Sequence, residues 1–250
     1  MDAQFLTEHV AIKKISDDDK VGVFEIDGLY RGYGVTVGNA IRRVLLSSLP
    51  GAAITRFKIK GVGHEFSAIP GVIEDVVEIG LNLKKVRFIF NAGEPQTLIL
   101  KVKGEKAVTA ADIKGNAEVS VANPDSHIAT LSSKDAELEI EITVEKGLGY
   151  VPVLGQKIGK LAVGTMALDA VFSPVKNANF IVSNMRVGEK IDYNKVRIEI
   201  ETDGTISPSR ALNIASNILF EHFKKISEMD VRDVEVVSEP EKPAKKSKKS

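Results

Sequence analysis

The stretch Arg31-Gly-Tyr-Gly-Val-Thr-Val-Gly-Asn-Ala-Ile-Arg-Arg-Val-Leu-Leu-Ser-Ser-Leu-Pro-Gly51 decides the fold of this chain. It predicts a glycine turn and then a helix that stops at Pro50–Gly51, with Thr36 or Asn39 as its capping residue. One face repeats at helical spacing, and we expect it to meet the core. That face consists of Val37, Ile41, Val44, Leu45 and Ser48.

A second stripe of the same helix consists of Asn39, Arg43 and Leu46. It combines an arginine with an exposed leucine, a mixture that is common at the centres of protein interfaces. Periodicity alone leaves two interpretations open, a docking face and an ordinary solvated face. The glycines before the helix do not have the spacing of a dinucleotide-binding motif, and no Walker lysine follows them. They predict a tight turn and close helix packing at Gly38.

The segments before and after this first helix are predicted to be mostly short strands, with one further helix. Strands are expected at 10–15 and 22–26, around an acidic turn at 17–19, and again at 52–60. A loop at 61–70 and a helix at 72–83 follow, and residues 85–146 read as a run of short strands. The clearest strand is Leu138–Val144, because apolar and polar residues alternate along it. Residues 147–152 are expected to form a mobile loop, and the middle region reads as a separate, mostly-strand domain.

The last predicted helix has an unusually wide apolar surface. Strands at 180–187 and 196–200 precede it, Ser207 caps it, Pro208 occupies its first position, and it runs to about Met229. Its apolar residues spread over more than the usual arc of about 100°. They are Ala211, Leu212, Ile214, Ala215, Ile218, Leu219, Phe223 and Ile226. Two interpretations remain open, packing against a second copy of the chain and deep burial in a monomer core.

Composition narrows the class of protein. The chain has 250 residues, of which 43% are hydrophobic and 27% charged, and its 34 basic and 34 acidic residues give a net charge of zero. A general nucleic-acid binder usually shows a basic excess, so the folded body does not fit that class. The chain has no cysteine, no apolar run long enough to span a bilayer and no secretory signal, and this fits a cytoplasmic protein. Residues 239–250 read as a disordered lysine-rich tail.

No catalytic motif is evident. The four histidines, His9, His64, His127 and His222, show no metal-ligand spacing, and no nucleophile elbow occurs. The acidic pair Glu74–Asp75 suits the start of a helix. We therefore expect an interaction protein that holds no metal and no cofactor.

Several ordered blocks resemble one family across roughly residues 20 to 230. Beyond the first helix, they are Gly61–Ser67, Gly71–Val76, Leu81–Lys84, Gly149–Pro152, Asp169–Val175 and Glu201–Ile206. Together they resemble the amino-terminal domain of the bacterial-type RNA polymerase alpha subunit.

The resemblance implies an α+β fold with two helices on an antiparallel sheet, interrupted by an inserted, mostly β domain. It implies a discontinuous dimerisation domain at 1–50 plus 174–230, an insert at 51–173 and a tail at 231–250. The first and last helices of each copy would pack against their mates in a homodimer. The residues assigned to dimerisation are Val37, Ile41, Leu45, Leu212, Ala215, Ile218, Leu219 and Phe223.

The resemblance also implies that the dimer is a scaffold for the beta and beta-prime subunits of the polymerase, without catalytic residues of its own. The implied beta contacts are Arg43, Leu46, His64, Glu65, Phe66, Tyr150 and Pro152, and the implied beta-prime contacts are Lys84 and Leu168. Many members continue into a DNA-binding domain, which we expect to be absent here, naturally or by truncation. Contact with DNA is therefore expected only through the assembled enzyme. A free-standing nucleic-acid-binding module acting through the tail is the alternative, and an independent enzyme is a more distant one.

Overall fold

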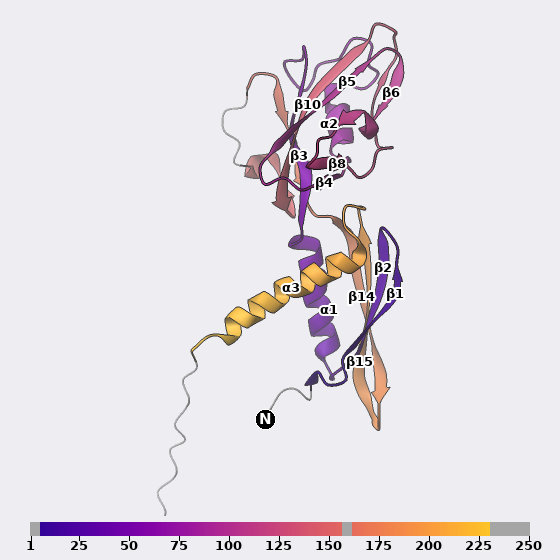
Figure 1. Cartoon of the computed structure of the whole chain (residues 1–250), viewed down its shortest axis with the longest axis vertical. Helices are drawn as coiled ribbons and strands as arrows, with labels where there is room; N and C mark the ends of the chain where they lie inside the picture. Colours follow the sequence, from indigo (N-terminus) through magenta and orange to yellow (C-terminus); the bar gives the residue numbers. More distant parts are fainter. Residues whose placement is uncertain (1–5, 157–161, 231–250) are drawn as a thin grey trace, which may run out of the picture.

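The computed structural model describes residues 6–156 and 162–230. These residues form two units with separate hydrophobic cores (Figure 1). The helix-backed unit contains β1 (Ala11–Asp17), β2 (Val21–Leu29), α1 (Tyr33–Ser47), β14 (Val175–Val187), β15 (Lys190–Thr202) and α3 (Pro208–Ser227). The strand-rich unit lies between α1 and β14 in the sequence. The fold is therefore α+β, as predicted, while the tail at 231–250 lies outside the described residues.

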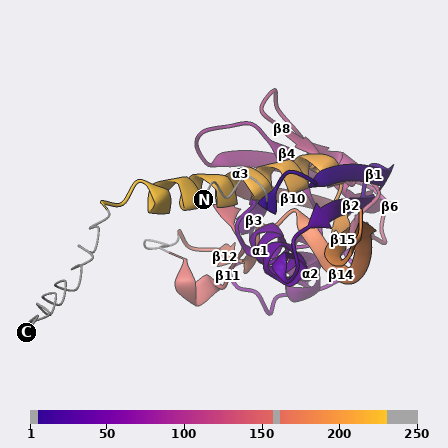
Figure 2. The ribbon, with the colours of Figure 1, turned by 90° about the horizontal axis from the view of Figure 1, so that it is seen from below.

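The helix-backed unit is a four-stranded antiparallel sheet in the order β1-β2-β15-β14, with α1 and α3 packed on one face. Residues such as Phe24 and Ile198 point from the sheet into the core between sheet and helices. On the other face, Lys195 Nζ lies 3.2 Å from Glu25 Oε2. This charged face leaves only one side of the sheet to be covered by helices. Figures 1 and 2 show the last turns of α3 projecting beyond the sheet.

The start of α1 differs from the prediction. The helix begins at Tyr33 after Gly32, whose φ of 86° lies in the left-handed region that suits glycine. Asn194 Oδ1, on β15, accepts hydrogen bonds from the backbone N–H groups of Gly32 (2.9 Å) and Gly34 (3.3 Å). Thr36 and Asn39 are therefore not the cap, because the helix starts earlier and a distant strand supplies the acceptor.

The rest of α1 follows the predicted pattern. A Cβ added at Gly38 would lie 2.5 Å from Phe180 Cδ2, which confirms close packing at that glycine. Ile41 and Leu45 are buried in the core. Leu46 is half-buried rather than exposed, because it packs against the edge of the same core. The helix ends at Ser47, and Pro50 already begins the next strand.

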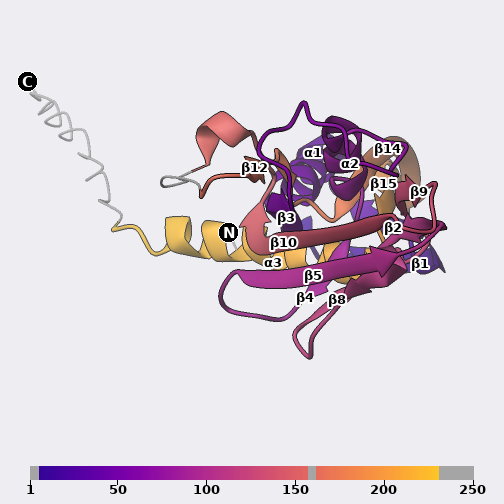
Figure 3. The same cartoon turned by 90° about the horizontal axis from the view of Figure 1, so that it is seen from above.

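The strand-rich unit is built on a five-stranded antiparallel sheet in the order β12-β3-β10-β5-β7, part of which Figure 3 shows from above. Alternate residues of the long central strand β10, from Leu138 to Val144, are fully buried, as the sequence predicts. The elements of this unit are β3 (Pro50–Ile59), α2 (Val76–Leu83), β4 (Phe88–Phe90), β5 (Gln96–Lys103), β6 (Lys106–Thr109), the 3-10 turn Ala110–Asp112, β7 (Ile113–Lys114), β8 (Val119–Val121), β9 (His127–Leu131), β10 (Glu137–Leu148), β11 (Tyr150–Val151), the 3-10 turn Val153–Gly155, β12 (Thr165–Ala167) and β13 (Ala170–Val171).

Two predictions for this unit are wrong. The helix expected at 72–83 begins only at Val76, where Asp75 Oδ1 accepts a hydrogen bond from Glu78 N at 2.7 Å. Glu74 does not stabilise the start of the helix, because its carboxylate accepts hydrogen bonds from β9 instead. The loop expected at 147–152 is largely strand, since β10 extends to Leu148 and β11 pairs with β13.

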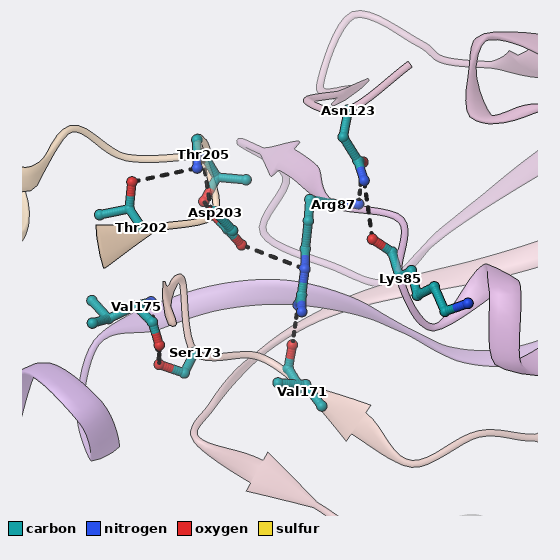
Figure 4. Close-up of polar contacts among 10 residues, drawn as sticks. Lys85, Arg87, Asn123, Val171, Ser173, Val175, Thr202, Asp203 and Thr205 are labelled. Atoms are coloured by element: carbon teal, nitrogen blue, oxygen red, sulfur yellow. Dashed lines mark hydrogen bonds and ion pairs between the residues drawn. The ribbon is translucent and has the colours of Figure 1, made fainter. Parts of the chain in front are cut away.

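The two units meet where the chain passes between them. Gly51 has no room for a Cβ, because the carbonyl oxygen of Phe172 lies against it. Arg87 provides a polar link: its Nε lies 3.7 Å from Asp203 Oδ2 on the helix-backed unit, and its Nη1 donates to the Val171 carbonyl at 3.0 Å (Figure 4). Both the chain crossings and this ion pair therefore hold the units together at one junction.

Candidate protein-interaction surfaces

The outward stripe of α1 presents Arg43 as an exposed side chain. Its neighbour Arg42 is held by a hydrogen bond from Nε to the Ala178 carbonyl at 3.2 Å, so the two arginines have different roles. Ser47 Oγ donates to the Arg43 carbonyl at 2.8 Å in the last turn. The half-buried Leu46 lies three residues further along the same side of the helix, so this stripe is a small mixed surface on a helix fixed by its sheet.

The loop before α2 presents a second exposed group. His64, Glu65 and Phe66 follow one another on it, and the Phe66 side chain is 80% exposed. Ser67 Oγ lies 3.2 Å from His64 Nδ1, and the Ser67 carbonyl accepts a hydrogen bond from Val76 N at the start of α2. An aromatic ring this exposed on a loop tied to a helix is a candidate contact for another protein.

A third surface brings together three predicted contact residues that are far apart in sequence. Lys84 Nζ forms an ion pair with Asp169 Oδ2 at 3.1 Å and lies 5.7 Å from the centroid of the Tyr150 ring. Leu168 packs beside α2, since a Cβ at Gly80 would lie 3.3 Å from its Cδ2. The structure thus joins Lys84, Tyr150 and Leu168 into one surface.

Asp169 organises this third surface, although sequence analysis assigned it no role. The backbone N–H of Val153 and the ammonium of Lys84 hold the pKa of Asp169 below its usual range, against a smaller opposing effect of burial. Asp169 therefore stays ionised and fixes the Lys84 side chain beside Tyr150. The only sequence signal for Asp169 was its place at the start of a family-like block.

The third surface adjoins the α1 stripe. A Cβ on Gly149 would lie 3.4 Å from the Ser47 carbonyl oxygen, so the turn between β10 and β11 abuts the last turn of α1. Pro152 is exposed just beyond Tyr150, and its carbonyl accepts from Gly155 N at 2.8 Å.

The apolar arc of α3 divides along the helix. Its first half is buried in the chain's own core, whereas the described residues from 220 to 230 are all exposed. Deep burial of the whole helix in a monomer core is therefore wrong for its second half. The exposed apolar side chains there are Phe220 (62% exposed), Phe223 (63%), Ile226 (65%) and Met229 (69%).

The eight residues assigned to dimerisation fall into three groups. Ile41, Leu45, Leu212 and Ala215 are buried in the helix-backed core; Val37, Ile218 and Leu219 are half-buried; Phe223 is exposed. The assignment from sequence does not include the exposed Phe220, Ile226 and Met229, although they repeat at a spacing of three residues from Phe223. Within residues 6–156 and 162–230, no group of three or more acidic, histidine or cysteine residues is arranged to hold a metal ion. No helix in those ranges is long and apolar enough to cross a membrane.

Comparison with known proteins identifies the family. Residues 57–173 match the model of the RNA polymerase Rpb3/RpoA insert domain. The chain is 44% identical over 238 residues to the DNA-directed RNA polymerase subunit alpha of Alkaliphilus metalliredigens, covering 94% of this chain and 75% of the relative. It is 45% identical over 229 residues to that of Symbiobacterium thermophilum, covering 91% and 72%. For Limosilactobacillus reuteri the identity is 46% over 213 residues, covering 84% and 68%. With relatives this similar along most of its length, the chain belongs to the family of bacterial DNA-directed RNA polymerase alpha subunits.

Proposed function

We propose that the chain forms a homodimer through the exposed half of α3 and the neighbouring face of α1. The observation that carries this proposal is the series Phe220, Phe223, Ile226 and Met229, four large apolar side chains that are each more than half exposed. Soluble proteins rarely leave such a contiguous apolar surface uncovered unless a partner binds it. A second copy offers the same surface, and self-complementary contact across a twofold axis is the commonest form of association.

The other dimerisation residues support this contact in different ways. Ile41, Leu45, Leu212 and Ala215 fix the two helices on the sheet from beneath, and Val37, Ile218 and Leu219 border the exposed surface. We assign residues 1–50 plus 174–230 to the dimerisation domain and residues 51–173 to the insert. The separate hydrophobic cores of the two units support this division.

The dimer then serves as the platform on which the two large polymerase subunits assemble. Arg43, Leu46, the loop from His64 to Phe66, Tyr150 and Pro152 are the proposed beta contacts, while Lys84 and Leu168 are the proposed beta-prime contacts. Because Lys84 and Tyr150 adjoin each other, the two sets overlap on one surface of each copy. Each identical copy therefore presents both sets, and the first large subunit to bind one copy leaves the other copy for the second large subunit.

We assign no catalytic residue, metal or cofactor to the chain itself. Two of its histidines have partners within the fold: His127 Nε2 bonds to Glu74 at 2.8 Å, and His222 Nδ1 bonds to the Ile218 carbonyl at 2.7 Å. The proposed role is to position subunits that carry out nucleotidyl transfer, in the cytoplasm, with DNA contacted only through the assembled enzyme.

Reconstitution with the beta and beta-prime subunits of the same organism tests this function. Native mass spectrometry should show two copies of this chain with one of each large subunit. Arg43→Ala should weaken beta capture by about 2 kcal/mol or roughly 30-fold, the scale of an arginine at an interface centre. Lys84→Ala should leave the complex with beta intact but slow the addition of beta-prime. The control is Arg186→Ala, which removes an exposed arginine near the end of β14 and should leave assembly unchanged. A dimer that binds neither large subunit would refute the scaffold role.

A further inference from the structure

A cavity of about 510 Å³ lies at the junction of the two units, apart from the exposed half of α3. Five cationic side chains line it: Lys20, Lys84, Lys85, Arg87 and Lys176. Asp203 is the single acidic residue among its lining residues. Figure 4 shows part of the site, with Arg87 lying between Asp203 and Val171, and Lys85 beside Asn123.

Two of the five cations are already compensated. Arg87 is paired with Asp203 at 3.7 Å, and Lys84 is paired with Asp169 at 3.1 Å. Within residues 6–156 and 162–230, Lys20, Lys85 and Lys176 form no ion pair, and Lys85 donates only to the neutral Asn82 Oδ1 at 3.0 Å. The cavity therefore holds three uncompensated positive charges in a chain whose net charge is zero.

The backbone fixes these three lysines on both units. The Lys20 carbonyl accepts from Thr202 N at 2.7 Å, and the Lys20 side chain lies along Gly204, where a Cβ would be 3.0 Å from its Cε. Lys176 stands on β14. The Lys85 carbonyl accepts from Asn123 Nδ2 at 3.0 Å in the strand-rich unit. A ligand bound to all three would contact both units at once.

We propose that this cavity binds a compact phosphate-bearing polyanion with about three negative charges, of the diphosphate class. Its volume falls within the range of roughly 300–1,000 Å³ that is usual for small-molecule sites. Lysine ammonium groups act as point charges for phosphate, and a single phosphate group carries only about two negative charges. The cations line one concavity instead of following a long surface stripe, so a small ligand fits better than nucleic acid. Binding would fix the orientation of the insert relative to the dimerisation domain.

Isothermal titration of the full chain with inorganic pyrophosphate at low salt tests the proposal. We expect saturable binding at one site per chain. Lys85→Gln and Lys176→Gln, which lie on different units, should each lower the affinity about tenfold, the lower end of the range for a lost charge-assisted hydrogen bond. Lys114→Gln and Lys190→Gln remove exposed lysines elsewhere on the same two units and should leave the affinity unchanged. Thermal unfolding without ligand verifies that each variant is folded.

Three results would overturn the proposal. The first is the absence of saturable binding, and the second is equal weakening by the control variants, which would indicate diffuse attraction of anions. The third is binding of a glutamate-rich peptide, lost in Lys176→Gln, by a chain that does not bind pyrophosphate. That result would assign the cavity to an acidic segment of a partner protein.

Discussion

Phe223→Glu should dissociate the proposed homodimer without unfolding the chain. The side chain is 63% exposed in the single chain and lies outside both cores, so the change removes little from either. Burying a whole phenylalanine contributes about 2.5 kcal/mol, and the exposed part of Phe223 would thus contribute about 1.6 kcal/mol per copy. The two copies in a dimer lose about 3 kcal/mol together, which weakens association more than about a hundredfold. Two carboxylates brought into an apolar contact would weaken it further.

Sedimentation velocity over a range of concentrations is the suitable assay. The unchanged chain should sediment as a dimer, and Phe223→Glu as a monomer at the same micromolar concentrations. Asn213→Glu adds the same charge at an exposed position of α3 ten residues before Phe223, outside the proposed contact, and should remain dimeric. Leu219→Glu is less informative, because Leu219 also packs against the core of its own chain. A Phe223→Glu protein that sediments like the unchanged dimer would show that α3 does not form the contact.

Three further predictions concern stability. Asn194→Ala should lower the free energy of unfolding by about 1–3 kcal/mol in urea denaturation, because two N–H groups at the start of α1 lose their acceptor; an unchanged midpoint would contradict the capping role. Gly38→Ala should cost about 1–3 kcal/mol by the same measurement, since its Cβ would overlap the ring of Phe180. For Glu74, burial would raise the pKa, but hydrogen bonds from His127 and Thr130 outweigh it and hold the pKa below its usual range. Its stabilisation is therefore present above the pKa of the unfolded state and lost as the pH falls through the lower folded-state pKa. Glu74→Gln should flatten the acid limb of the stability–pH curve, and an identical limb would refute this.

Local patterns predicted the elements whose signals lie within a few residues. The alternation from Leu138 to Val144 placed a central strand, because period-two burial is a property of that segment alone. Ser207 and Pro208 placed the start of α3 for the same reason, and Ser207 Oγ accepts a hydrogen bond from Arg210 N at 3.4 Å. The hairpin of β14 and β15 is longer than predicted, since β14 begins at Val175 instead of 180, and β15 begins at Lys190 instead of 196. The added distal part of β15 is held by backbone pairing between mostly polar residues.

Contacts between distant residues could not be read from the sequence. The acceptor that caps α1 is Asn194 on β15, which is too far from Gly32 in the sequence for a local pattern to reveal it. Glu74 looked like a helix-start residue, yet its partners are on β9. Likewise, the sequence showed the apolar arc of α3. It could not show at which residue the helix extends beyond the sheet, and therefore which part of the arc is exposed. Sequence analysis could therefore name single contact residues, but only the structure showed that some of them lie together around Asp169.

The Asn194 cap also sets an order for folding during synthesis. Gly32 and its acceptor are 162 residues apart, a stretch that takes roughly 8 to 30 s to make at about 5–20 residues per second. Throughout that interval α1 has emerged from the ribosome without the strands that cover its apolar face. The strand-rich unit, by contrast, is complete before β14 begins and has its own core. The middle of the chain can therefore fold first, and the two ends close together only afterwards. In the cell, the apolar faces of β2 and α1 thus stay open to chaperones and to aggregation until the last strands and α3 have been made.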